Sequence, residues 1–401
     1  MGGDTASTRE GASRWWAPVL VALIFLVPLN LRPALTSVGP LLPQIGEDLR
    51  VNEGMQGLLG ALPLLAFALV SPLVQHPARR FGMERCLLAA LVVLAAGVLI
   101  RSYTGSVGLW AGTMIVGCVI AVGNVLVPTI VKRDYAGHVS LATGVYSACI
   151  TIAASVASAV AVQLANSAGW RGSLAFWAIP ALVVAVLWIP RARAGGPKQT
   201  TSTTIGHPIA SVWRQRTAWL VTAFIGLQST TFYVMVTWLP TIETSTGISP
   251  EQAGVHLFLY QIVGVAAGLA IPRLMRRPGS QTAATVTASV PMVIGVTGLL
   301  LAPALGAVWA VIAGLGTGAS LVVALSLISL RGRSHHETTQ LSGMAQSLGY
   351  LLAAIGPIVT GYLAEHTGTW RGSLALIGAL ALVQVIVAVS AGRDRRHQRE
   401  R

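Results

Sequence analysis

Long apolar runs separated by short polar and basic segments dominate the pattern of this 401-residue chain. A helix needs about 20 apolar residues to cross the hydrocarbon core of a bilayer. The uncharged stretch 278–330 is too long for one helix, so we divide it at 302–306, where "APALG" supplies turn residues. The pattern then predicts twelve membrane-spanning helices, at 15–43, 54–75, 86–103, 107–131, 139–164, 172–190, 217–240, 252–272, 281–301, 307–330, 338–363 and 372–392.

The composition supports an all-α membrane protein. Hydrophobic residues make up 54% of the chain and charged residues only 10%, against about 25% charged residues in soluble domains. The net charge of +14 is carried by short clusters between apolar runs, so it indicates membrane topology and argues against nucleic-acid binding. The three cysteines lie in apolar runs without metal-ligand spacing, and we expect no metal or other cofactor.

The basic residues also predict the topology. If the N-terminus is cytoplasmic, the inner segments hold 22 of the 27 Lys and Arg residues. The outer segments then hold only Arg50, Arg101, Arg171 and Arg371. Because cytoplasmic loops are enriched in Lys and Arg, we expect both termini to lie in the cytoplasm of a multi-pass plasma-membrane protein.

The chain contains an internal repeat. "WRGSLA" occurs at 170–175 and again at 370–375, each time just before a predicted span. "RRFG" at 79–82 and "RRPG" at 276–279 follow the second and eighth spans in the same way. The repeat predicts two six-helix units of the same orientation, with the domain organisation 1–14 (cytoplasmic tail), 15–190 (N-terminal bundle), 191–216 (cytoplasmic linker), 217–392 (C-terminal bundle) and 393–401 (basic tail).

Along its whole length the chain resembles the major facilitator superfamily, whose members hold substrate between two such halves near the midplane and work by alternating access. "RRFG" resembles the superfamily's short cytoplasmic signature, although Arg79 stands where Asp is usual and Gln75 where Gly is usual. "LNLRPALTSVGPLLPQI" (29–45), "PLLAFALVSPL" and "ARRFG" are similar to the cyanate/2-nitroimidazole permease family. This resemblance implies a monomeric transporter, not an enzyme, for a small polar or anionic solute.

Arg32 is the candidate substrate-binding residue with the clearest physical argument. It lies about seventeen residues into the first span, near mid-depth, where an arginine costs about 2.5–3.5 kcal/mol. Every Asp and Glu lies outside the predicted spans. An anionic or strongly dipolar ligand would therefore supply the missing partner of the guanidinium, beside a helix that Pro28 and Pro33 should break. The alternative is that Arg32 reaches the membrane surface or bonds backbone carbonyls.

Neutral polar side chains at mid-depth are further candidates for ligand contact. Such groups can donate hydrogen bonds to a small anion, and the alternative for each is a hydrogen bond between helices. They are Asn30, Asn124, Gln228, Tyr233, Tyr260, Gln261, Gln346 and Tyr350.

Gating residues are expected nearer the inner face. Tyr146 lies six residues into the fifth span and is expected in an inner gate. The pairs Arg79–Arg80 and Arg276–Arg277 could bond helix carbonyl ends or Glu84 and Asp134 when the inner side is shut; the alternative is a plain positive anchor.

Coupling and competing functions remain open at this point. Without an acid inside a span, two modes of transport are possible: the solute moves down its own gradient, or a proton moves with it. The first mode is favoured. In the second, the proton would be carried by the ligand or by His256, near the outer end of the eighth span, whose alternative role is an interfacial hydrogen bond. A multidrug efflux facilitator for apolar cations would need a buried acid. A membrane enzyme would have only His335, His336 and Glu337, in an inner loop, as a reactive cluster.

Overall fold

The computed structural model describes residues 21–135, 137–194, 212–275, 281–332 and 335–393, and every regular element within them is a helix. The first half contains η1 (Leu23–Leu26), α2 (Pro28–Leu31), α3 (Pro33–Thr36), η2 (Gly39–Leu41), α4 (Leu42–Leu49), α5 (Glu53–Val70), η3 (Ser71–Leu73), α6 (Gln75–Phe81), α7 (Met83–Tyr103), α8 (Gly105–Asp134), α9 (Val139–Ala175) and α10 (Ala178–Ala194). The second half contains η4 (Val212–Arg214), α11 (Arg216–Thr244), α12 (Pro250–Ala270), α13 (Pro272–Met275), α14 (Thr282–Leu301), η5 (Pro303–Leu305), α15 (Gly306–Arg331), α16 (His335–Thr367) and α17 (Arg371–Gly392).

These helices confirm the predicted all-helical membrane fold. Within the described residues, eleven segments are long and apolar enough to cross a bilayer. The sixth predicted span, 172–190, is divided between two helices. The chain kinks at Gly169, whose φ is 67°, and the residues after the kink form the end of α9. Most of the span lies in the 17-residue α10. The predicted break at 302–306 is present as η5. The predicted tail 1–14, the linker residues 195–211 and the tail residues 394–401 lie outside the described residues.

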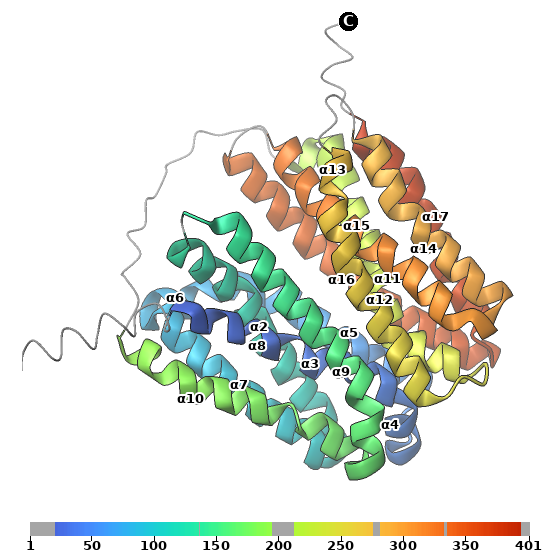
Figure 1. Cartoon of the computed structure of the whole chain (residues 1–401), viewed down its shortest axis with the longest axis horizontal. Coiled ribbons are helices and arrows are strands. Elements are labelled where there is room, and N and C mark those ends of the chain that lie inside the picture. The colour runs from blue at the N-terminus through green and yellow to red at the C-terminus, as the bar shows by residue number, and fades with distance from the viewer. Residues whose placement is uncertain (1–20, 136, 195–211, 276–280, 333–334, 394–401) are drawn as a thin grey trace, which may run out of the picture.

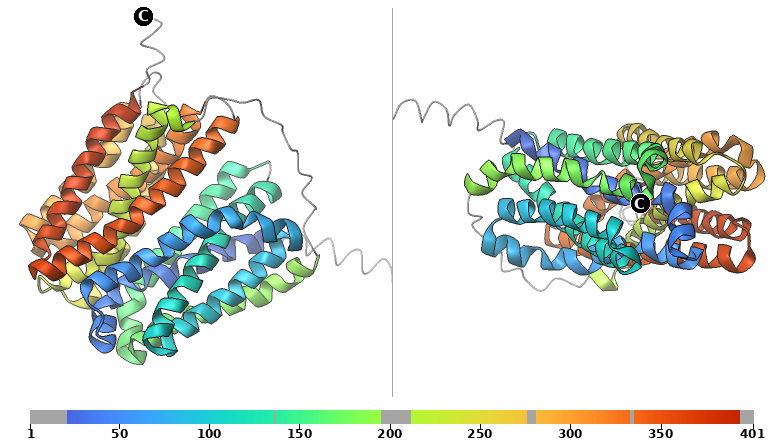
Figure 2. Two further views of the ribbon diagram at one scale, coloured as in Figure 1. Left: turned by 180° about the vertical axis from the view of Figure 1, so that it is seen from behind. Right: turned by 90° about the horizontal axis from the view of Figure 1, so that it is seen from below.

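The helices form two bundles that meet at one end (Figures 1 and 2). Between the bundles, α5 packs against α16 and α9 packs against α12. A Cβ atom at Gly57 would lie 2.2 Å from the Pro357 carbonyl oxygen, so only glycine allows this approach of α5 to α16. The Glu365 carboxylate then accepts hydrogen bonds from Asn52 Nδ2 (2.9 Å) and from the Gly54 backbone N–H (3.1 Å). We call this region, around Asn52 and Glu365, the closed end.

The bundles separate toward the opposite end, which we call the open end. On α9, Leu141 is 69% exposed and Val145 is 40% exposed. A side chain added at Gly144 on α9 or at Gly343 on α16 would meet nothing within 4 Å. Both positions lie near the ends of α9 and α16 that the Lys and Arg distribution assigns to the cytoplasm.

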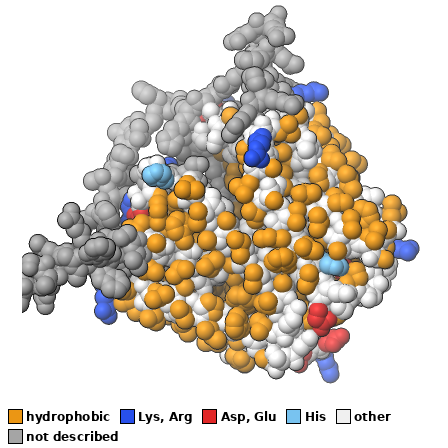
Figure 3. Space-filling model, viewed as in Figure 1, with side chains coloured by type: hydrophobic (Ala, Val, Ile, Leu, Met, Phe, Trp, Pro, Cys, Tyr) orange, Lys and Arg blue, Asp and Glu red, His pale blue; other side chains and the backbone are white. Residues whose placement is uncertain are grey.

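The outer surface is apolar, as a bilayer requires. Figure 3 shows hydrophobic side chains over most of one face, with charged side chains mainly toward its ends. Large aliphatic residues on α10, such as Leu182 and Val186, are 44% and 63% exposed. Because water would penalise so much exposed apolar surface, these helices face lipid.

Two charged residues that the sequence analysis assigned to the outer side are buried within helices. Arg101, assigned to an outer segment, lies inside α7 and is 1% exposed. Glu243, assigned to the loop after the seventh span, lies inside α11 and is 1% exposed. α7 ends at the same residue as the predicted span 86–103, whereas α11 continues four residues past the predicted span 217–240, and in both helices a charged side chain near the end is buried. The expectation that no carboxylate lies within a span is therefore corrected.

Candidate functional site: an arginine at the break in the first span

The first span is broken where the sequence predicts it. Pro28 begins α2 and Pro33 begins α3, and neither can donate a backbone hydrogen bond. Arg32 stands between these two short helices, with φ −102° and ψ −32°. Its backbone oxygen accepts from the Thr36 backbone N–H at 2.9 Å, and the Thr36 hydroxyl donates to the Ala154 carbonyl at 3.0 Å. The break is thus fixed to α9 and presents Arg32 to the space between the bundles.

The Arg32 guanidinium contacts the opposite bundle. Its Nη1 donates a 3.0 Å hydrogen bond to the hydroxyl of Tyr233 on α11. Its Nε is buried and has no hydrogen-bond partner. Tyr350 on α16 and Tyr146 on α9 also interact electrostatically with the guanidinium. Tyrosines from three helices therefore lie near this cation, and Tyr233 forms a hydrogen bond with it.

No carboxylate neutralises this cation within the described part of the chain. The ion pairs found there involve Arg133, Arg171, Arg191 and His256, and none involves Arg32. Arg32, Tyr146 and Tyr350 each keep partial exposure, so the site is not sealed. A partly exposed positive charge with one unused, buried donor therefore lies at this site.

Aromatic rings line the same region. Phe67 on α5 meets Tyr350 edge to face, with 6.0 Å between ring centroids. Phe232 lies between Tyr233 (5.0 Å, edge to face) and Tyr260 (6.2 Å, stacked). Flat rings can stack on a planar solute while the guanidinium and phenol hydrogen-bond its edge.

The other predicted contact residues occupy different settings. The Asn30 amide donates to the Leu26 carbonyl at 2.9 Å, and its Oδ1 is buried without a partner. Asn124 is half-buried in α8, and Gln228 accepts a 3.3 Å hydrogen bond from Ser229. The Tyr260 hydroxyl is 2.8 Å from the Thr317 hydroxyl. Gln261 donates to Ser158 at 3.1 Å, and Gln346 is exposed and donates to Ser342 at 2.8 Å. Their roles toward a ligand stay predictions.

The gating predictions also stay predictions. Arg79 and Arg80 are exposed, and the Arg80 guanidinium lies 5.3 Å from the centre of the Phe81 ring. The acids that they were expected to meet are held by others: Glu84 by Arg133 at 2.6 Å, and Asp134 by Arg133 and by Arg191. Arg276 and Arg277 lie outside the described residues.

Two features of the site were missed from the sequence. Arg101 Nη1 donates a 2.6 Å hydrogen bond to the Ala34 carbonyl, which lies in the broken segment beside Arg32. Glu243 Oε2 lies 2.9 Å from His256 Nδ1, and Glu243 Oε1 is buried without a partner. A signal for both was available, because Arg101 and Glu243 directly follow apolar runs that continue as helix.

In the described part of the chain, no group of three His, Cys, Asp or Glu side chains could hold a metal ion. The expected solvated loop at 335–337 is instead the first turn of α16. Glu337 is 3% exposed there and accepts a 2.6 Å hydrogen bond from Gln215. The side chains of His335 and His336 lie outside the described residues.

Comparison with known proteins shows which family has this architecture. Residues 24–354 match the family model of the Major Facilitator Superfamily. The chain is 40% identical to the 2-nitroimidazole transporter of Escherichia coli (strain K12), over 94% of this chain and 96% of that protein. It is 29% identical to the cyanate transport protein CynX of the same strain, over 88% of this chain and 91% of that protein.

Solved structures agree on the fold. A bacterial homologue of the human lysosomal transporter Spinster, crystallised in an inward-facing and unoccupied conformation, superposes with a TM-score of 0.76 at 13% identity, over 93% of this chain and 95% of that chain. The relatives are transporters and not enzymes, as the sequence predicts. The chain is therefore a multi-pass membrane transporter that belongs to the major facilitator superfamily and, within it, to the cyanate/2-nitroimidazole permease family.

Proposed function

We propose that this transporter moves a small anionic or strongly dipolar planar solute across the plasma membrane, with Arg32 and Tyr233 as its central binding pair. The observation that carries the proposal is the Arg32 guanidinium, which has an unused buried Nε and bonds a tyrosine of the opposite bundle. A solute that accepts from both groups would bridge the two halves. Cyanate-like and nitroimidazole-like molecules fit, because each has acceptors in one plane and little apolar bulk.

Alternating access is the proposed cycle. The halves 15–190 and 217–392 would rock about the site while the closed end opens and the open end shuts. We assign the open end to the cytoplasm, with both termini, from the Lys and Arg distribution. The conformation described is then inward-facing. We expect the protein to act as a monomer, since each half supplies part of the site.

Export of apolar cations is the competing function, and the surroundings of Arg32 disfavour it. A cation would meet a guanidinium, and the described residues place no carboxylate against it. Glu243 is already paired with His256.

Ligand-induced thermal stabilisation of the purified protein tests the substrate class. We expect cyanate and 2-nitroimidazole to raise the melting temperature by a few degrees at saturating concentration, since binding only the native state stabilises it. Unsubstituted imidazole and the cation tetraphenylphosphonium serve as controls and should produce no shift. Stabilisation by the cation alone would contradict the proposal.

We also propose that Glu243 and His256 form the proton site of the transporter. Glu243 is on α11 and His256 is on α12, and the start of α15 packs against them. A Cβ atom at Gly306, the first residue of α15, would lie 2.5 Å from Glu243 Oε1. Few other charges lie on the helices around this pair. No charged residue occurs in α14, η5 or α15 before Arg331, and Glu251 on α12 accepts a 3.0 Å hydrogen bond from Asn166. α12 packs on α9 through Gly254 and Gln261, so a change of charge at His256 would act on the contact between the halves.

Glu243→Gln is expected to uncouple transport from the proton gradient. In proteoliposomes under an imposed pH gradient, the unchanged protein should accumulate labelled cyanate, whereas the variant should only equilibrate it, to a ratio of about 1. Exchange of internal for external solute should persist, because the Arg32 site is intact. Glu251→Gln, on the same helix, is the control and should accumulate normally. Accumulation by Glu243→Gln at the normal level would reject this site.

A further inference from the structure

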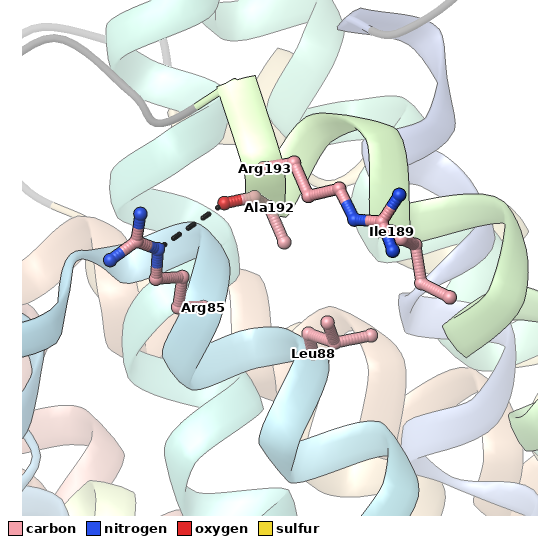
Figure 4. Close-up of a pocket in the computed structure, with 5 residues that line it drawn as sticks. All are labelled: Arg85, Leu88, Ile189, Ala192 and Arg193. Carbon is pink, nitrogen blue, oxygen red and sulfur yellow. Dashed lines mark hydrogen bonds between the residues drawn. The ribbon is translucent and has the colours of Figure 1, made fainter.

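Two arginines flank a shallow groove where α7 begins and α10 ends (Figure 4). Arg85 and Leu88 come from α7, and Ile189, Ala192 and Arg193 come from α10. The two helices pack against each other at the edge of the first bundle (Figure 1). The groove has a volume of about 440 Å³.

Both guanidiniums are available to a ligand. Arg85 and Arg193 are exposed. Arg85 Nε donates a long hydrogen bond of 3.5 Å to the Ala192 carbonyl, which leaves its two terminal nitrogens unused (Figure 4). Neither arginine belongs to an ion pair found among the described residues. The groove is therefore flanked by two positive groups, one on each side (Figure 4).

The nearby acids are already engaged inside the bundle. Glu84, next to Arg85 in sequence, is 3% exposed and pairs with Arg133 at 2.6 Å. Asp134 pairs with Arg133 and Arg191. Among the described residues, the acids next to the groove are thus paired elsewhere, and no described carboxylate forms an ion pair with Arg85 or Arg193.

The surface beyond the arginines is apolar. Leu88 and Ile189 line the groove itself. One turn deeper, Val92 on α7 is 48% exposed and Val186 on α10 is 63% exposed. Because α7 starts and α10 ends here, both valines lie toward the membrane centre. A ligand that suits this surface has a negative head at the level of the arginines and an apolar chain below it.

We propose that this groove binds the headgroup of an anionic phospholipid, with an acyl chain along the apolar faces of α7 and α10. Basic grooves between membrane helices attract anionic headgroups, and juxtamembrane arginines strengthen that attraction. A zwitterionic lipid would add a positive group with no free carboxylate to meet it. A soluble anion would leave the apolar surface without a partner. The site is separate from Arg32 and independent of the transported solute.

Native mass spectrometry of the detergent-purified protein tests the proposal, with phosphatidylglycerol and phosphatidylcholine of the same acyl chains as probes. The double variant Arg85→Gln/Arg193→Gln should bind phosphatidylglycerol about tenfold more weakly, since each removed charge weakens the attraction. Its phosphatidylcholine binding should not change. The control is Arg79→Gln/Arg80→Gln, which removes two exposed charges at the same end and should keep phosphatidylglycerol binding.

Further arms separate the alternatives. Leu88→Trp keeps both charges but fills the groove, and it should also lose phosphatidylglycerol binding; this variant decides the question if the double variant does not fold. Equal loss in both arginine double variants would show a general charge effect and overturn the site. Displacement of phosphatidylglycerol by millimolar inorganic phosphate would mean that a free anion suffices, which would also overturn it.

Discussion

Arg32→Ala is expected to abolish transport while leaving the amount of protein in the membrane near normal. A hydrogen bond to a charged group contributes about 1.5–3 kcal/mol, so the loss of one such bond weakens binding by about 10- to 150-fold. Loss of two bonds at a bidentate site would put binding beyond detection. The folded state should survive, because removing Arg32 breaks one side-chain hydrogen bond, to Tyr233, and relieves the cost of an arginine at mid-depth.

Two further variants sharpen this experiment. Arg32→Lys keeps the charge but not the planar pair of donors, so we expect partial loss of binding. Tyr233→Phe removes only the 3.0 Å bond with the charged guanidinium, and at about 1.5–3 kcal/mol for such a bond the expected loss is about 10- to 150-fold. Uptake and thermal-shift titrations measure both, with immunoblotting for abundance. Normal transport by Arg32→Ala would remove the guanidinium from the binding site.

Arg101→Ala is expected to lower both stability and substrate affinity. The Arg101 side chain is fully buried, and its 2.6 Å bond satisfies the Ala34 carbonyl beside the break. Truncation leaves that carbonyl unpaired and opens a cavity, at a cost of about 3 kcal/mol. The melting temperature should fall, and the segment that presents Arg32 should lose its support.

Arg101→Met separates these two effects. It keeps most of the volume and removes a buried charge whose Nε and Nη2 have no partner, so stability should stay near normal. Affinity should still fall, because the Ala34 carbonyl remains unpaired. If Arg101→Met binds substrate as tightly as the unchanged protein, Arg101 is a packing residue and does not position Arg32.

Much of the candidate site follows from local sequence. Pro28 and Pro33 break the first span because proline cannot donate a backbone hydrogen bond, and Arg32 is conspicuous because a charge at mid-depth is costly. Tyr146 illustrates the limit. It was expected in a gate because of its shallow depth in α9, a role that stays a prediction, and it packs against the same hydrophobic cluster as Tyr350. Depth along a helix says nothing about how that helix is rotated, and α9 packs directly against α2 and α3, on either side of the break.

By itself the sequence determined the helical membrane fold, its two-part repeat and the break at Arg32. Each of these features depends on residues within one helix or one repeat: on the hydropathy of a segment, on a repeated motif or on the position of a proline. They can therefore be predicted from neighbouring residues alone. Only the tertiary structure decided that Tyr233 meets Arg32 while Gln346 is exposed, and that Arg101 and Glu243 are buried. These outcomes depend on how each helix is rotated and how far its neighbours cover its ends. The rotation and coverage of each helix are determined by packing between residues that are far apart in the sequence, such as Arg32 and Tyr233, which are 201 positions apart.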